Sequence, residues 1–438
     1  MLRTILLGVG LVAVLFSVLI FSGKIPIGGS EKSTPKGSVV IWGVVPEEGL
    51  SLPLSRFNAE VNTYSAQYVY VSEDKFNQKL LEALASGTGP DMILAPYQII
   101  LSQRERIYPF PSASFPEKKF KDTFVDGASI LYSPQGALAF PLAVDPMVMF
   151  YNRAMLSKHG IVNPPSYWDE VATLTPTLTI KQKVQIDESA IALGSPTSMY
   201  TKDILMTIVN QLGQTPVLLG SVSDGNIRTG ISIKANTPTT EKGDATVFPL
   251  TTALRFITEF SDPTKTSYTW NDTLGRADDR FVAEKLALYI GYESEYRTLK
   301  ARNPRAEFEM TYLPQTRNYN TFVTGMRLYG LATLKTSRNP QVALTIQSQF
   351  SSGDMVQVLA PLIGGVPALR QYAATSGVDP VIAKSILVAR GWYDFYQDES
   401  DRLTTVMVSD VVNHRFTVSE ASEMFVTRLR DYYSNKNY

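Results

Sequence analysis

One acidic residue stands inside an apolar run and is the strongest candidate for chemistry in the chain. Asp145 follows the run Phe140–Val144 and precedes Pro146–Phe150. A carboxylate in such a segment is costly to bury unless it pairs with a donor or binds something polar. Asp145 could accept hydrogen bonds from the hydroxyl groups of a bound solute, or it could bind the local backbone. We favour the first interpretation.

Aromatic side chains supply flat apolar faces on which a sugar ring can stack. Trp42 ends an apolar strand at the edge where open α/β sheets bind ligands, and it is as good a candidate for stacking as for the core. Trp270, Trp392, Tyr200 and Tyr329 lie in segments that could reach the same surface. Packing is nevertheless the commoner role of an aromatic residue, so these four are secondary candidates.

Catalytic chemistry finds little support in the sequence. The only two histidines, His159 and His414, stand beside charged neighbours in contexts typical of solvated helix ends. Asp278 and Asp279 form an acid pair on a helix face, without the context of a glycosidase dyad. Metal-ligand spacings, nucleotide-binding loops and nucleophile motifs are missing. We therefore predict a protein that is not an enzyme and that needs no metal or cofactor.

Composition bounds the class of protein. A chain of 438 residues is too long for one compact core and suits two lobes of ordinary domain size. Lys+Arg and Asp+Glu number 41 each, so no basic nucleic-acid surface is indicated. Cysteine is absent, which excludes disulfides, thiolate metal ligands and thiol nucleophiles.

Strand and helix patterns alternate along the chain, which predicts α/β lobes with mainly parallel sheets. The strands and crossings that we expect cover 38–42, 67–71, 92–95, 140–152, 310–314, 324–333 and 364–367, and a helix end runs into a strand over 281–292. The helices that we expect cover 55–61, 74–84, 202–212, 248–260 and 339–350.

Several short motifs stand in a fixed order along the chain. They are Gly87-Thr-Gly-Pro-Asp91, Pro141–Asp145 followed by Tyr151-Asn152, Pro164-Pro165 before Trp168-Asp-Glu170, Phe281–Gly291, and Gly365-Val-Pro367. Together they resemble the extracellular solute-binding proteins of ABC importers, specifically the maltose-binding-protein-like group. The resemblance runs from about Val39 to the C-terminus. One residue of the stretch Phe281–Gly291 departs from the family pattern, since Glu284 stands where the family usually has a glycine.

The resemblance implies which positions face a ligand. They are Glu47 in the loop after the first strand, Tyr97 and Gln98 after the third, Asp145 at the crossover, and Tyr292 and Glu293 after the stretch ending at Gly291. The implied ligand is a small solute, in this group a sugar or oligosaccharide, and the implied partners are the permease subunits of an ABC importer.

The N-terminus indicates the compartment. Arg3 precedes the uncharged run Thr4–Gly23, which is long enough to cross a bilayer as a helix with the positive end in the cytoplasm. No lipobox cysteine follows, and a signal-peptidase site is poor. We predict an uncleaved signal anchor over 1–23 and a linker over 24–37, so that the bulk of the chain is extracytoplasmic. The alternative is a secreted or periplasmic protein after signal cleavage.

These inferences give one predicted architecture. We expect an α/β, two-lobed periplasmic-binding-protein-like fold of type II after an N-terminal transmembrane helix. Residues 38–146 plus 325–362 would form lobe I, and residues 147–324 plus 363–438 would form lobe II. The lobes would close over the solute by bending at the crossings. The alternative function is a membrane-anchored sensory or scaffolding ectodomain of the same fold.

Overall fold

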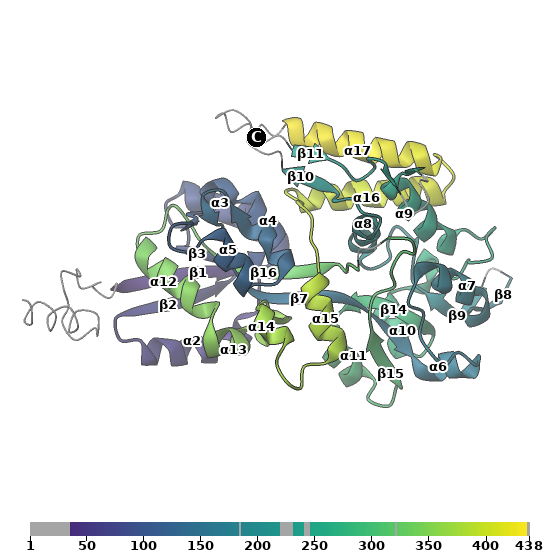
Figure 1. Ribbon diagram of the computed structural model, residues 1–438, viewed down its shortest axis with the longest axis horizontal. Coiled ribbons are helices and arrows are strands. Elements are labelled where there is room, and N and C mark those ends of the chain that lie inside the picture. Colours follow the sequence, from purple (N-terminus) through teal and green to yellow (C-terminus); the bar gives the residue numbers. More distant parts are fainter. Residues whose placement is uncertain (1–35, 184, 220–230, 241–245, 320–321, 436–438) are drawn as a thin grey trace, which may run out of the picture.

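Two α/β lobes lie side by side and are joined by strands that run between them (Figure 1). The computed structural model describes residues 36–183, 185–219, 231–240, 246–319 and 322–435. The predicted anchor over 1–23 and almost all of the predicted linker lie outside the described residues. None of the helices in the described ranges is both long enough and apolar enough to span a membrane.

Lobe I is built on a core of parallel strands. β1 (Gly37–Gly43) pairs in parallel with β2 (Tyr64–Tyr70) and with β3 (Met92–Pro96). Every residue of β3 is buried, as expected of a strand with both faces covered. The helices of this lobe are α2 (Glu47–Glu60), α3 (Glu73–Ala85), α4 (Tyr97–Ser102), α5 (Glu117–Thr123), α12 (Pro340–Phe350) and α13 (Gly353–Ile363). Three short strands form a small separate sheet: β4 (Phe110–Pro111), β5 (Tyr132–Ser133) and β6 (Gly136–Ala137).

Local sequence explains these elements. In α3, Phe76, Leu80 and Ala83 recur at helical spacing and are buried, while Glu73 and Asp74 stand in the first turn. Acidic side chains there are favoured by the positive end of the helix dipole. The Gly-Pro-Asp turn before β3 is structural, since Asp91 accepts hydrogen bonds from the Val40 N–H at 2.9 Å and the Ser337 hydroxyl at 2.6 Å.

Lobe II has a mixed sheet with helices around it. Its strands besides β7 are β8 (Ile180–Gln182), β9 (Gln185–Ile191), β14 (Leu286–Tyr292) and β15 (Phe308–Thr311). Its helices are α6 (Arg153–Lys158), α7 (Trp168–Leu178), α8 (Thr201–Gln211), α9 (Pro249–Thr258), α10 (Ala277–Val282), α11 (Glu295–Arg302), α16 (Gln397–Val412) and α17 (Val418–Asn435). Two small hairpins pair β10 (Val217–Leu219) with β11 (Ile231–Ile233), and β12 (Thr239–Thr240) with β13 (Thr246–Val247). Trp168 lies in the core, where its indole N–H donates to Gln211 Oε1 at 2.7 Å.

Strand β7 (Phe140–Asn152) belongs to both lobes. Its first half pairs with β16 (Met326–Thr333) and β17 (Val366–Pro367), and its second half pairs with β14 and β15. The strand order β2-β1-β3-β16-β7-β14-β9-β8 therefore runs through the whole molecule. Between Pro146 and Met147 the strand changes partner from β16 to β14. The predicted two-lobed α/β architecture is confirmed.

One segment lies at the junction of the lobes and contacts both. It contains α14 (Arg370–Ala373) and α15 (Pro380–Val388) and leads into the stretch before α16. Arg370 and Arg390 both pair with Asp126 of lobe I, whereas Asp394 pairs with Lys202 of lobe II. The chain thus passes from one lobe to the other between residues 390 and 394.

Candidate functional site

The crossing strands place Asp145 opposite an arginine. In the antiparallel pairing of β7 with β16, Asp145 is the partner of Arg327, and Pro146 is the partner of Met326. Tyr292, the last residue of β14, pairs with Met147 next to them. Residues from both lobes therefore meet within a few positions on one strand.

Asp145 is fully buried, and both of its carboxylate oxygens accept hydrogen bonds from Ser294. The Ser294 N–H donates to Oδ1 at 3.0 Å and the Ser294 hydroxyl donates to Oδ2 at 2.7 Å. Burial raises the pKa of Asp145 to about 7, although the bonds from Ser294 and the charge of Arg327 act in the opposite direction. In this conformation Asp145 binds the protein itself, which is the second of the two roles considered from the sequence.

Arg327 packs against two tyrosine rings of lobe II. Its Cζ atom lies 3.9 Å from the ring centroid of Tyr292 and 5.1 Å from that of Tyr200. The two rings meet edge to face with their centroids 5.0 Å apart. Arg327 and Tyr329 are half-buried, whereas Leu328 between them and Met326 before them are buried. Because side chains alternate along a strand, Arg327 and Tyr329 share one face.

Tyr200 precedes α8 in a left-handed backbone conformation, with φ of +60°. Bulky residues rarely adopt this conformation, and it costs of the order of 1 kcal/mol or more. Such strain is common where a ligand is held. The conformation here places the Tyr200 ring against Arg327 and Tyr292.

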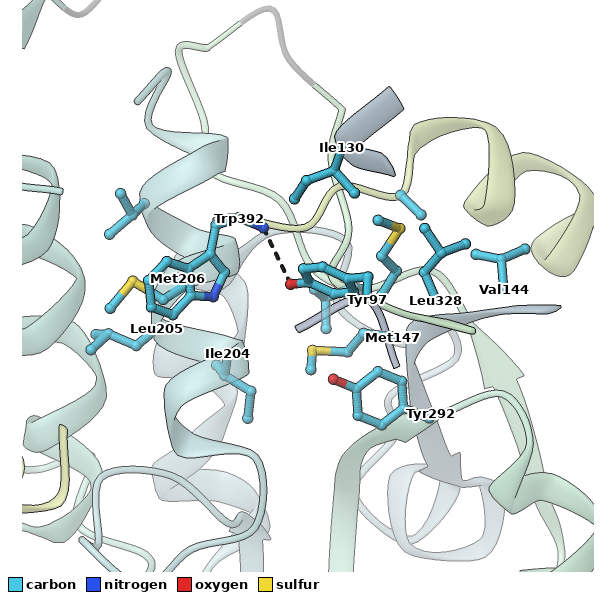
Figure 2. Packing of buried hydrophobic residues seen from close by; sticks show 14 of the residues in the cluster. Tyr97, Ile130, Val144, Met147, Ile204, Leu205, Met206, Tyr292, Leu328 and Trp392 are labelled. Atoms are coloured by element: carbon cyan, nitrogen blue, oxygen red, sulfur yellow. Dashed lines mark hydrogen bonds between the residues drawn. The ribbon is translucent and has the colours of Figure 1, made fainter. Parts of the chain in front are cut away.

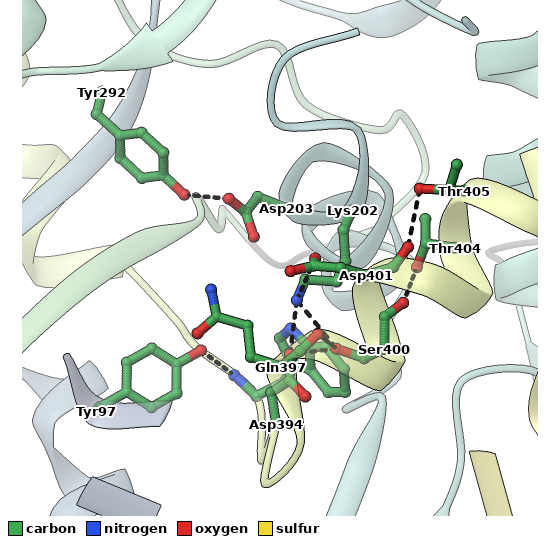
Figure 3. Close-up of polar contacts among 11 residues, drawn as sticks. Tyr97, Lys202, Asp203, Tyr292, Asp394, Gln397, Ser400, Asp401, Thr404 and Thr405 are labelled. Carbon is green, nitrogen blue, oxygen red and sulfur yellow. Dashed lines mark hydrogen bonds and ion pairs between the residues drawn. The ribbon is translucent and has the colours of Figure 1, made fainter. Parts of the chain in front are cut away.

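Tyr292 is almost completely buried and bonds to the first turn of α8. Its hydroxyl donates to Asp203 Oδ2 at 2.8 Å (Figure 3). Its backbone N–H donates to Glu295 Oε1 at 2.8 Å. Burial raises the pKa of Tyr292 well above its ordinary value, and the neighbouring charge of Asp203 raises it further. Tyr292 is therefore a neutral donor at any physiological pH.

Lys202, the neighbour of Asp203 in α8, is the centre of a buried ionic group. Its ammonium lies 2.8 Å from Asp394 Oδ2, 2.6 Å from Asp401 Oδ1 and 3.0 Å from the Ser400 hydroxyl (Figure 3). The hydroxyl of Ser400 donates to Asp394 at 2.7 Å. Burial alone would lower the pKa of Lys202, but the charges of Asp394 and Asp401 raise it well above its usual range. This group fastens α16 to α8.

An apolar bridge joins the lobes beside these polar groups. Tyr97 begins α4 in lobe I, and its hydroxyl accepts a hydrogen bond from the backbone N–H of Trp392 at 3.3 Å (Figure 2). Both side chains are buried, with exposures of 2% and 5%. They belong to one hydrophobic cluster together with Met147, Ile204 and Leu328.

A cavity of about 620 Å³ opens between the lobes next to this bridge. Lobe I contributes residues of α3 and α4, among them Glu73, Asn77 and Gln98. Lobe II contributes Phe395 and Gln397, with their neighbours at the start of α16. Phe395 is 1% exposed and its ring is covered by Arg104, so the aromatic surface of the cavity comes from the half-buried Tyr396 and Tyr432. Such aromatic groups beside amides and carboxylates can bind a polar solute.

The remaining sequence candidates lie in different surroundings. Trp42 is half-buried at the end of β1, and Glu47 is exposed in the first turn of α2. Trp270 is 2% exposed in the core of lobe II. Glu293 lies with Arg297 and Asp379 in a second pocket of about 520 Å³. The structure thus brings Asp145, Tyr200 and Tyr292 together and places Tyr97, Gln98 and Trp392 nearby. Glu293 follows Tyr292 directly, and its backbone N–H donates to the Pro146 carbonyl at 3.0 Å, whereas its side chain lines the second pocket. Trp42, Glu47 and Trp270 are not among the residues that line the cavity of about 620 Å³.

Sequence reasoning missed four charged residues of the junction: Arg327, Lys202, Asp203 and Asp394. A signal for Arg327 was present, because it is the only charge in the run Gly325–Leu334 and occupies the same kind of position as Asp145. Lys202, Asp203 and Asp394 carry no local signal, since they meet only through the packing of α8 against the segment before α16.

The fold is shared with solved solute-binding proteins. The sugar-binding protein MalE of Xanthomonas citri aligns with a TM-score of 0.71 and 15% identity, over 91% of this chain and 98% of that one. A cyclo/maltodextrin-binding protein complexed with maltotetraose gives 0.69 and 14%, over 91% and 98%. A Thermotoga lettingae solute-binding protein bound to α-D-tagatose gives 0.65 and 18%, over 90% and 99%. These likenesses establish the class of fold.

Residues 54–386 match the model of the bacterial extracellular solute-binding protein family, and the chain belongs to that family. Its members are binding proteins, so the prediction that the chain is not an enzyme is confirmed, and its working location is extracytoplasmic. Putative binding proteins of Brucella abortus and Brucella suis are 27% identical over 118 residues. That match spans 26% of this chain and 28% of those relatives.

Proposed function

We propose that the protein binds a small carbohydrate or related polyhydroxylated solute between its lobes and delivers it to the permease of an ABC importer. The observation that carries this proposal is the cavity of about 620 Å³, because its lining comes from both lobes: from α3 and α4 of lobe I, and from the start of α16 and Tyr432 of lobe II. The ligands of the solved proteins of this fold, maltotetraose and α-D-tagatose among them, support a sugar as the solute. Bending at the crossings would close the lobes over it.

Thermal unfolding of the purified protein with a panel of sugars and oligosaccharides tests the proposal. A ligand at one hundred times its Kd stabilises the folded state by about 2.7 kcal/mol, which gives a clear rise in Tm. Small-angle scattering with and without the same ligand tests closure, with a smaller radius of gyration expected when it is bound. A broad panel of neutral and charged solutes without any rise in Tm would contradict solute binding.

The boundaries of the two lobes are part of the proposal. We assign 38–146 plus 325–362 to lobe I and 147–324 plus 363–438 to lobe II, and the change of partner at Pro146 and Met147 supports the first boundary. The pairing of Arg370 and Arg390 with Asp126 favours moving the last boundary to about residue 391. Proteolysis with mass spectrometry would locate the cleavable connections.

The N-terminal segment is proposed as an uncleaved membrane anchor, on the basis of the run Thr4–Gly23 and the missing cysteine after it. Mass spectrometry of the mature N-terminus tests this, and a start near residue 30 would contradict it. An anchored sensory or scaffolding ectodomain is the competing function. Co-purification with permease subunits favours import, and its absence from a preparation that retains the anchor favours the competing function.

A further inference from the structure

The charged residues that line the cavity of about 620 Å³ all have one sign. Four of its lining residues are acids, two from the first turn of α3 and two from the first turn of α16: Glu73, Asp74, Asp398 and Glu399. Lysine, arginine and histidine do not occur among the described lining residues, and most of the other polar side chains there are uncharged amides. Each lobe therefore contributes two acids, and the described lining offers no cation to balance them.

Two of these acids are free to bind a solute. Glu73 and Asp398 are exposed, and within the described ranges neither side chain makes a hydrogen bond or an ion pair. The other two bond to neighbours on their own helices, since Asp74 accepts from the N-cap serine of α3 and Glu399 pairs with Arg402 at 2.6 Å. One carboxylate on each side of the cavity is thus without a partner among the described residues.

Acids in the first turn of a helix are common, because the positive end of the helix dipole stabilises them. This effect explains an acid on either helix, but it does not explain why both helices present their acids to the same cavity. Partial desolvation raises the pKa of Glu73, the charge of Arg327 lowers it, and Asp401 of the other lobe raises it further. Like charges of the two lobes therefore oppose each other, and a cation in the cavity would relieve their repulsion.

Aromatic rings provide an independent reason to expect a cation in this cavity. Tyr396 and Tyr432 line it, are half-buried, and pack edge to face with their ring centroids 5.1 Å apart. The face of a tyrosine ring attracts an ammonium group, and proteins use aromatic rings in this way to bind amine ligands. The cavity thus combines two features that favour an amine, carboxylates and aromatic rings.

We propose that the solute bound in this cavity carries a protonated amine, which the carboxylates of Glu73 and Asp398 bind from the two lobes. An amino sugar, or an oligosaccharide of amino sugars, has both the hydroxyl groups that the amides can bind and the charge that the acids favour. An acidic solute would meet only like charges and is disfavoured. This inference rests on the proposed function and narrows its solute class from polyhydroxylated solutes to positively charged ones.

Calorimetry on the full-length protein with matched solutes tests the inference. D-glucosamine and its trisaccharide are compared with their neutral N-acetylated counterparts, and D-glucuronate is the acidic member of the panel. Just below neutral pH the amines are protonated and carboxylates of ordinary pKa are ionised. We expect an amine to bind at least about 10-fold more tightly than its acetylated counterpart, because a charge-assisted hydrogen bond is gained. This difference should shrink as the salt concentration rises.

Variants at the two free carboxylates locate the effect. Glu73→Gln and Asp398→Asn should each lower the preference for the amine over its acetylated counterpart about 3- to 10-fold, and the double variant should lower it further. Asp354→Asn is the matched control, since it removes an exposed acid from the first turn of α13, outside the cavity lining, and should leave the preference unchanged. Unchanged near-ultraviolet circular dichroism confirms that each variant is folded.

The outcomes separate the two proposals. Equal affinity for the amine and its acetylated counterpart, tighter binding of D-glucuronate, or an undiminished preference in the folded double variant would overturn the inference and leave solute binding intact. Binding of neutral sugars alone, in calorimetry or in the thermal panel, would do the same. If neither this panel nor the thermal panel gives any binding to the wild type, both proposals fail together.

Discussion

Two cations lie at the lobe junction, Lys202 buried and Arg327 half-buried, and they differ in what surrounds them. Lys202 has two carboxylates and a hydroxyl within 3.0 Å, all from the segment around the start of α16. Arg327 has two tyrosine rings and no carboxylate within pairing distance in the described part of the chain. The Lys202 ammonium is fully paired, although the second oxygen of Asp394, Oδ1, is buried without a hydrogen-bond partner among the residues that the structure describes. Arg327 is held by aromatic rings, so the same kind of charge is neutralised by ion pairs in one place and packed against ring faces in the other.

This difference predicts opposite consequences of mutation. Loss of a cation from a complete ionic group leaves buried carboxylates uncompensated and damages the fold. Loss of a cation that pairs with none of the described carboxylates leaves no acid uncompensated, so folding changes little. Measuring the free energy of unfolding of variants at Lys202 and at Arg327 can therefore confirm or contradict this difference before any ligand is known.

The largest effect is expected for Lys202→Met. Asp394 is 1% exposed and would lose the cation that pairs with it, so the free energy of unfolding should fall by about 3–5 kcal/mol. Urea denaturation followed by circular dichroism measures it. Lys118→Met, which breaks an exposed ion pair, should change the same free energy by less than about 0.5 kcal/mol. A decrease below about 1 kcal/mol for Lys202→Met would mean that the Lys202 group is not structural.

The next largest effect is a pH dependence in the Arg327 region. Asp145 has a folded-state pKa of about 7, above its unfolded value of about 3.9, so the folded state binds the proton more tightly. The stabilisation from this proton is complete below about pH 4 and is lost as pH rises through about 7. Because one pKa unit is worth about 1.4 kcal/mol, the total is about 2–4 kcal/mol.

Asp145→Asn should remove that share of the pH dependence, because an amide keeps an acceptor and a donor for Ser294 but does not titrate. Unfolding free energies of wild type and variant measured from about pH 4 to about pH 8 should converge at low pH and differ most at the high end. Exposed Asp122→Asn serves as the control. Parallel profiles for wild type and Asp145→Asn would show that Asp145 does not titrate in this window.

A smaller effect is expected for Ser400→Ala. The substitution removes one hydrogen bond to the buried Asp394 carboxylate while Lys202 remains, so the free energy of unfolding should fall by about 1–2 kcal/mol in the same urea assay. Ser51→Ala, in an exposed turn of α2, should stay within about 0.5 kcal/mol. If Lys202→Met and Ser400→Ala combined in one chain lower it by the sum of their separate effects, the group is not cooperative.

The smallest effect on folding is expected for Arg327→Gln, whose free energy of unfolding at neutral pH should lie within about 1 kcal/mol of wild type. Among the described residues the substitution breaks no ion pair, and the cation–π interaction that it removes is worth about 1 kcal/mol. The charge of Arg327 lowers the pKa of Asp145, so the pH profile of this variant should shift upward. If Arg327→Gln lowers the free energy of unfolding as much as Lys202→Met does, the two cations do not differ in their structural role.

The sequence predicted most of the framework because the framework has local signals. Apolar runs marked β1, β3 and β7, and the run around Arg327 marked a second crossing, all of which the structure contains. Glu284 is instructive, because it replaces the usual glycine and has a φ of +57°, a conformation that glycine adopts more easily. The turn geometry is therefore kept although the residue that favours it is gone.

The candidate site was less predictable because its members meet only through long-range packing. Tyr292 and Asp203 are 89 residues apart, and Lys202 and Asp394 are 192 apart. No periodicity of a strand or helix could tell that Trp270 packs inside lobe II while Trp392 lies at the junction. The set of ligand-facing residues expected from the sequence stays a prediction, and binding measurements on its members will decide it.

The paired strands at the junction have a mechanical consequence. Where β7 leaves lobe I, Met147 N–H donates to the Gly325 carbonyl at 2.9 Å, the Thr324 hydroxyl donates to the Met147 carbonyl at 2.6 Å, and β17 pairs on the same strand. A sheet of hydrogen-bonded strands bends out of its own plane more easily than its strands slide past one another, because sliding breaks the hydrogen bonds between them. The proposed closure of the lobes would therefore bend the strands across the sheet instead of sliding them past one another, and a mutation that removes these hydrogen bonds should make that closure less directional before it makes the protein less stable.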